Sequence, residues 1–162
     1  MVIRALKHLF MPGWLARRAF GPASVRAIER AIKDSERRHR GEIRFALEGP
    51  LHVTHLRHSA RQRARQVFAL LDVWDTEEKT GVLIYVQLVD RAIEIVADRG
   101  IAKRVPQAEW DAICRAMERA FRADRYEQGA LEAIGTVTAI LARHFPPGAA
   151  NPNELPDKPV VL

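Results

Sequence analysis

A chain of 162 residues is long enough for one domain, since a domain typically takes roughly 100–200 residues. With 48% hydrophobic and 28% charged residues and one cysteine, Cys114, the composition excludes a disordered chain, an intramolecular disulfide and a cysteine-based metal site, and it favours a reducing compartment. The formal charge of +6 is uneven, because residues 1–66 hold 15 Lys and Arg against 5 Asp and Glu. No aromatic residue lies among the arginines of 57–65 and no nucleic-acid-binding motif is present, so nucleic acid is not an expected partner.

Residues 1–23 form a basic, amphipathic N-terminal segment. Lys7 breaks its apolar run and no Ala-x-Ala-like cleavage site follows, so we expect it to be retained on the cytoplasmic side rather than removed as a secretion signal. Such a segment packs on protein or lies on an anionic membrane surface. The residues expected to contact a membrane or a partner are Arg4, Lys7, Trp14, Arg17 and Arg18.

The first half of the domain predicts helix, strand and helix. A helix runs from Ser24 to about Arg40, and the alternation over 42–48 predicts a strand with Ile43, Phe45 and Leu47 on one face. The three- and four-residue apolar spacing over 60–75 predicts a second helix whose inner face includes Trp74. Its outward face is expected to carry Arg61, Arg63 and Arg65.

The second half begins with a strand over 82–89 that is apolar on both faces, as in a sheet covered on both sides. A turn at Asp90-Arg91 then predicts an antiparallel strand over 92–97, with Leu88 opposite Ala92. Helices follow, from Pro106 to about Arg122 and from Glu127 to His144, and the proline-rich residues 146–162 predict an extended tail.

This order of elements predicts an α/β fold. A crossover connection makes the first two strands parallel, and the hairpin adds an antiparallel neighbour. The expected architecture is a three-layer α/β/α sandwich, in which helices flank a small mixed sheet over residues 24–145.

Carboxylates converge on the edge of this sheet where the second strand begins. Asp75 and Glu77 precede that strand, Asp98 follows its hairpin partner, and Glu42 opens the parallel neighbour. Oxygen ligands of this kind suit Ca²⁺ or Mg²⁺, so these four residues are a candidate metal site, with Arg99 as a phosphate contact. The alternative is a solvated turn neutralised by nearby basic residues. No motif for an organic cofactor is present.

Two further features leave their roles open. The spacing of His52, His55 and His58 suits a divalent transition metal if the segment is helical, but exposed, unligated histidines are commoner in a polar connection. Cys114 has no histidine partner in sequence, so we expect a buried structural thiol.

A family resemblance rests on several strings taken together. They are Gly41-Glu42-Ile43-Arg44-Phe45, Val73-Trp74-Asp75-Thr76-Glu77, Gly81 to Val86, Asp90 to Ile101, Tyr126-Glu127-Gln128-Gly129 and Asn153-Glu154-Leu155-Pro156-Asp157. With these strings, residues 24–145 and the tail resemble the TPM-domain family, specifically its stand-alone bacterial branch.

The resemblance implies an α/β/α sandwich and a loosely fixed function. Relatives include thylakoid-lumen proteins with acid phosphatase activity, photosystem II repair proteins and receptor accessory subunits, and some bind calcium. Stand-alone members are associated with LemA-type membrane proteins. Where many relatives have Gly-x-Gly after the third strand, this chain has Asp98-Arg99-Gly100, so phosphatase activity does not simply carry over.

Two functions therefore remain in view. The first is a non-catalytic accessory module that acts with a membrane-protein partner and binds a divalent cation. The second is a metal-dependent hydrolase of phosphomonoesters, in which Asp75 and Asp98 hold a metal that activates water.

Overall fold

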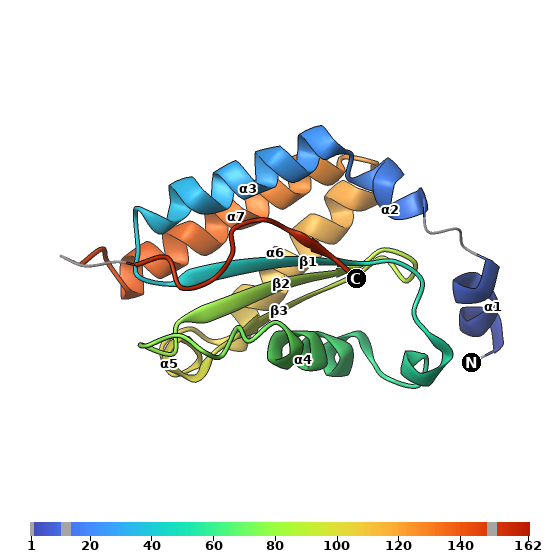
Figure 1. Ribbon diagram of the computed structural model, residues 1–162, viewed down its shortest axis with the longest axis horizontal. Coiled ribbons are helices and arrows are strands. Elements are labelled where there is room, and N and C mark those ends of the chain that lie inside the picture. The colour runs from blue at the N-terminus through green and yellow to red at the C-terminus, as the bar shows by residue number, and fades with distance from the viewer. Residues whose placement is uncertain (1, 11–13, 149–151) are drawn as a thin grey trace.

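The computed structural model describes residues 2–10, 14–148 and 152–162, and it places side chains from residue 6 onward in these ranges, except 15–17. Its described elements surround one four-stranded sheet (Figure 1). The helices are α1 (Val2–Phe10), α2 (Trp14–Ala19), α3 (Pro22–Glu36), the 3₁₀ helix η1 (Val53–His55), α4 (Ala60–Leu70), α5 (Arg99–Ala102), α6 (Gln107–Arg122) and α7 (Tyr126–His144). The strands are β1 (Glu42–Glu48), β2 (Gly81–Gln87), β3 (Ala92–Ala97) and β4 (Val160–Val161).

The sheet order is β3-β2-β1-β4. The predicted parallel pairing of β1 with β2 and the antiparallel hairpin of β2 with β3 are both confirmed. The hairpin register differs by one residue, because Gln87 rather than Leu88 lies opposite Ala92. Strand β4, which the sequence did not predict, pairs in parallel with β1 and brings the end of the tail into the sheet.

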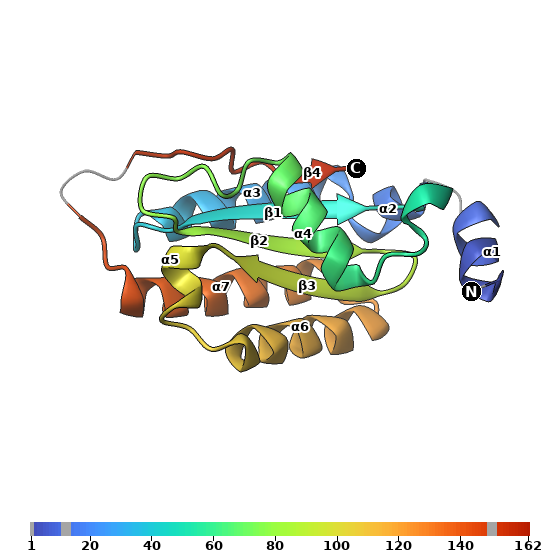
Figure 2. The same ribbon diagram turned by 90° about the horizontal axis from the view of Figure 1, so that it is seen from below.

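Helices cover both faces of the sheet, which confirms the three-layer α/β/α sandwich. Helices α3, α6 and α7 lie on one face and α4 on the other, as the two views agree (Figure 2). The larger apolar core lies under the three helices and includes Phe45, Ile84 and Trp110. A smaller core under α4 includes Tyr85 and Leu155. Burial of each such large side chain contributes about 1.5–3 kcal/mol.

Three predicted helix boundaries were wrong, and one of them is the end of α3, which lies at Glu36 rather than at about Arg40. Helix α3 begins at Pro22, a residue whose fixed φ suits a first helical position, and Ser24 donates instead to Glu127 (2.6 Å). Helix α4 ends at Leu70, because Asp72 adopts a left-handed φ of 52° that a helix does not continue through. Trp74 consequently lies outside the helix and is 46% exposed rather than buried.

The prediction that α4 turns its arginines outward was wrong for two of the three. Arg63 donates to Glu48 of β1, and Arg61 donates to the Ile95 carbonyl and pairs with Glu94 on β3. Long arginine stems reach along apolar surface to place their charge at a distant partner. Only Arg65 is exposed as predicted.

The polar face of β1 is buried by the tail and α4. Arg44 is 8% exposed, and its Nη1 donates to the carbonyls of Pro156 (2.6 Å) and Lys158 (2.5 Å). These charge-assisted bonds fix the tail across the strand, although Arg44 Nε is buried without a hydrogen-bond partner.

Candidate functional site

The backbone brings Glu42 and Asp98 to the same edge of the sheet, where β2 begins. Glu42 of β1 lies opposite Gly81 of β2, and the Asp98 amide donates to the Gly81 carbonyl (2.9 Å). Gly81 has to be glycine, because a Cβ there would lie 1.9 Å from the Val73 carbonyl oxygen. The connection from α4 therefore packs tightly against the entrance to β2.

The four predicted cation ligands do not lie together as one set. Asp98 is 5% exposed and caps α5 by accepting from the Arg99 amide (2.6 Å), and Glu42 is 1% exposed and accepts from the Leu155 amide (3.2 Å). Asp75 and Glu77 are exposed. Among the described residues, no group of three histidine, cysteine or acidic side chains is arranged to hold a metal ion.

Two observations bear on the charge of this edge. Arg40 pairs with Glu78 at 2.5 Å, which supports the alternative of a neutralised turn. The other Asp98 oxygen, Oδ2, is buried and has no hydrogen-bond partner, and Arg99 is 79% exposed with its Nε 4.0 Å from Oδ1. One buried carboxylate oxygen at the predicted site is thus left without a donor.

A carboxyl cluster, made of the buried Glu36 and Glu42 and the half-buried Asp157, lies beside this edge under the tail. Glu36 accepts from the Ile43 amide (3.2 Å) and is hydrogen-bonded to Asp157. Burial, reinforced by the charge of Glu42, raises the pKa of Glu36 to about 9, and burial raises the pKa of Glu42 to about 7. Glu36 therefore holds a proton at neutral pH.

A cavity of about 410 Å³ opens next to the carboxyl cluster. Its wall combines both signs of charge with the start of the tail: Lys33, Glu36, Arg37, Glu42, Pro147, Gly148 and Asn153. Nearby, His39 is fully buried and accepts from the Gly41 amide (3.2 Å), and its burial lowers its pKa to about 4.

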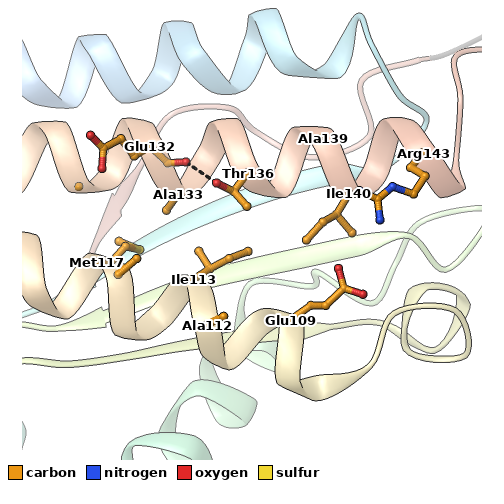
Figure 3. Close-up of a pocket in the computed structure, with 12 residues that line it drawn as sticks. Glu109, Ala112, Ile113, Met117, Glu132, Ala133, Thr136, Ala139, Ile140 and Arg143 are labelled. Carbon is orange, nitrogen blue, oxygen red and sulfur yellow. Dashed lines mark hydrogen bonds between the residues drawn. The ribbon is translucent and has the colours of Figure 1, made fainter.

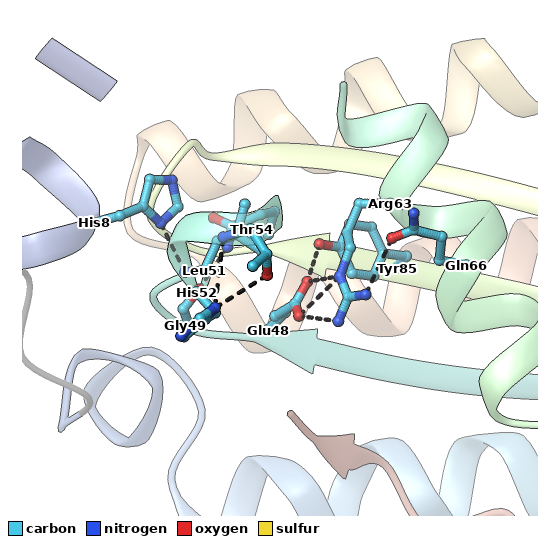
Figure 4. A network of polar contacts seen from close by, with 10 residues as sticks. His8, Glu48, Gly49, Leu51, His52, Thr54, Arg63, Gln66 and Tyr85 are labelled. Atoms are coloured by element: carbon cyan, nitrogen blue, oxygen red, sulfur yellow. Dashed lines mark hydrogen bonds and ion pairs between the residues drawn. The ribbon is translucent and has the colours of Figure 1, made fainter. Parts of the chain in front are cut away.

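A second polar network lies at the opposite end of β1 (Figure 4). Glu48 accepts from the Tyr85 hydroxyl and from Arg63 Nε (3.0 Å) and Nη2 (2.6 Å). Burial raises the pKa of Tyr85, and the hydrogen bond to Glu48 raises the pKa of Arg63. The three groups satisfy one another in the smaller core.

Helix α1 is held to the domain by one histidine. His8 is 4% exposed, and its Nδ1 accepts from the Leu51 amide (2.9 Å; Figure 4). Nδ1 therefore carries no proton. Nε2 lies 3.2 Å from the Asp90 carboxylate but makes no hydrogen bond. This contact joins α1 to the end of the sheet that carries Glu48.

The other side of the N-terminal segment faces solvent. Its exposed apolar residues are Leu6 (47%), Leu9 (72%), Phe10 (76%) and Trp14 (54%). Lys7 and Arg18 are exposed beside them, whereas the side chains of Arg4 and Arg17 lie outside those described. We call Leu6, Leu9, Phe10 and Trp14 the N-terminal apolar patch.

A groove of about 430 Å³ separates α6 from α7 (Figure 3). Small and apolar residues line most of it, including Ala112, Ile113, Met117 and Ala133. Cys114 is buried on α6, and its burial raises the pKa of the thiol to about 12, as expected for a structural cysteine.

The sequence analysis missed Glu36, Asp157 and His8. A signal existed for the first two, because a strand with helices over both faces needs a cover for its charged side, and the tail offers Leu155 and Val160. His8 had none, since its partners lie 43 and 82 positions away.

The family model of the TPM domain matches residues 17–140. The chain belongs to the TPM domain family. Among solved structures, this TPM-domain chain is similar to BA42 from the psychrophilic bacterium Bizionia argentinensis, with 31% identity and a TM-score of 0.77, over 88% of this chain and 94% of that one. It also shares its fold with the N-terminal domain of a P. gingivalis protein, with 13% identity and a TM-score of 0.64, over 87% and 96% of the two chains. No curated protein matches.

No helix in the described part of this TPM-domain chain has the length and apolar character to cross a membrane.

Proposed function

We propose that this TPM-domain protein is a non-catalytic accessory module that works at the cytoplasmic face of a membrane and docks there through its N-terminal apolar patch. The observation that carries this proposal is the exposure of Leu9 and Phe10 on a helix whose opposite side is fastened by His8. The patch remains exposed to solvent although His8 fastens α1 to the domain. Exposed apolar residues beside basic ones are typical of helices that lie in a membrane interface.

The free energy expected from burying the patch in a membrane is large enough to be measured with protein-free vesicles. Burying a leucine or phenylalanine side chain contributes about 1.5–3 kcal/mol, and Lys7 and Arg18 would add attraction to anionic headgroups, on the order of 1 kcal/mol each. If a membrane protein of the LemA type is the partner instead, the same patch would bury against its surface, and binding would require that protein.

The first prediction concerns Leu9→Glu combined with Phe10→Glu. We expect this double variant to lower the affinity for vesicles of phosphatidylcholine and phosphatidylserine at least about tenfold, measured by cosedimentation. The matched control is Leu70→Glu with Trp74→Glu, which makes the same charge change at two exposed apolar residues of another surface. Equal losses in the two doubles would contradict docking through α1. Wild-type binding to native membranes but not to vesicles would assign the patch to a protein partner.

Cation binding at the acidic edge is the second part of the proposal, and the unsatisfied Asp98 Oδ2 supports it. We expect Ca²⁺ or Mg²⁺ to shift amide resonances near Asp98 in wild-type protein, and Asp98→Asn to remove those shifts. Asparagine caps a helix as well as aspartate does, so α5 should persist in the variant. Phosphate release from a generic phosphomonoester in the same samples, lost in Asp98→Asn, would favour the alternative function, a metal-dependent hydrolase. If neither protein changes its spectrum on addition of Ca²⁺ or Mg²⁺, cation binding at this edge is contradicted.

A further inference from the structure

The connection from β1 to α4 holds the three histidines on successive backbone turns. The His55 amide donates to the His52 carbonyl (2.9 Å), and the His58 amide donates to the His55 carbonyl (3.0 Å). Hydrogen bonds of this i to i+3 type define a geometry with three residues per turn, in which side chains three apart lie on one side. The local fold therefore gathers residues that an extended loop would spread apart.

The imidazoles of His55 and His58 lie close together and half-buried. Their ring centroids are 5.7 Å apart, with the planes tilted by 35°. Zn²⁺ binds imidazole nitrogen at about 2.0–2.1 Å, so two rings on one ion have centroids roughly 5–6 Å apart. The observed spacing fits two rings that share one ion.

One buried ring nitrogen of this pair points to a ligand. His55 Nδ1 is buried and has no hydrogen-bond partner, although buried polar nitrogens are nearly always satisfied. Arg63 projects from α4 nearby, but both oxygens of Glu48 hold its guanidinium (Figure 4).

We propose that His55 and His58 bind a divalent transition-metal ion, of which Zn²⁺ is the probe. The pair supplies two ligands and water fills other positions, since no third ligand is in place among the described residues. His52 is the nearest candidate for a third, once its ring leaves the Thr54 hydroxyl (3.0 Å). The ion is of a different class from Ca²⁺ or Mg²⁺, because imidazole suits zinc, copper and nickel.

The test is a Zn²⁺ titration of the full chain without a polyhistidine tag, followed by imidazole proton–nitrogen correlation spectra. We expect one equivalent to shift the ring nitrogens of His55 and His58 and to leave those of His39 and His144 in place. His55→Ala and His58→Ala should each weaken Zn²⁺ binding at least about tenfold, and His144→Ala should not change it. Thermal melting of each variant checks the fold.

Shifts spread over His144, or wild-type affinity in both variants, would overturn the site. The wild-type spectra decide the matter even if a variant unfolds, because they need no substitution. The outcome is independent of membrane docking and of Ca²⁺ binding, since neither of those experiments depends on His55 or His58.

Discussion

Glu48→Ala should lower the free energy of unfolding by about 3–5 kcal/mol, the usual cost of removing one partner from a buried ion pair. Glu48 and Arg63 have side chains only 7% and 12% exposed, and Tyr85 is fully buried beside them. Without the carboxylate, the guanidinium and the hydroxyl both lose their partner in the smaller core. Urea denaturation at neutral pH measures the loss.

A surface pair provides the matched control for Glu48. Glu118→Ala removes the partner of Arg122, whose side chain is 65% exposed, and should cost at most about 0.5 kcal/mol because exposed pairs are screened by water. The double variant Glu48→Ala with Arg63→Ala should recover part of the loss, because it leaves no unpaired buried charge. If Glu48→Ala costs no more than Glu118→Ala, Glu48 does not stabilise the smaller core.

The strands and their pairing were predictable because hydrophobic periodicity encodes them locally. The apolar run that became β2 and the alternation that became β1 each specify a strand and the faces it buries. The hairpin register was one residue off, since Arg91 takes a left-handed φ of 53° in the turn and Leu88 falls outside β2. The spacing of apolar residues does not predict a turn conformation of that kind.

The candidate sites were less predictable because their contacts span the chain. Glu42 and Asp98 were placed correctly at one edge by topology, but whether side chains converge depends on rotamers and on what covers them. Glu42 is covered by Leu155, 113 positions away. The alternation of β1 places charged residues on one face, and the folded tail helps to make that face an interior surface.

The carboxyl cluster should make stability fall as pH rises. The pKa of Glu36 is raised to about 9 in the folded protein from an ordinary value of 4.5, so between these values the folded state binds more protons than the unfolded state. The free energy of unfolding therefore decreases with increasing pH in this window. We expect a loss on the order of 2 kcal/mol between pH 6.5 and 8.5, measured by urea denaturation across that range.

Glu36→Gln should remove most of this pH dependence. Glutamine reproduces the protonated carboxyl, because its oxygen accepts from the Ile43 amide and its amide group donates to Asp157, and it does so at every pH. The variant should match the wild type near pH 5 and exceed its stability at pH 8.5. Glu132→Gln, at an exposed residue of α7 that accepts from Gln128, should leave the wild-type slope unchanged. His39 has a lowered pKa, so it changes the stability only below pH 6.5. Because all three proteins contain His39, its contribution cancels when they are compared. A wild-type slope in Glu36→Gln would show that Glu36 is not the group that holds the proton.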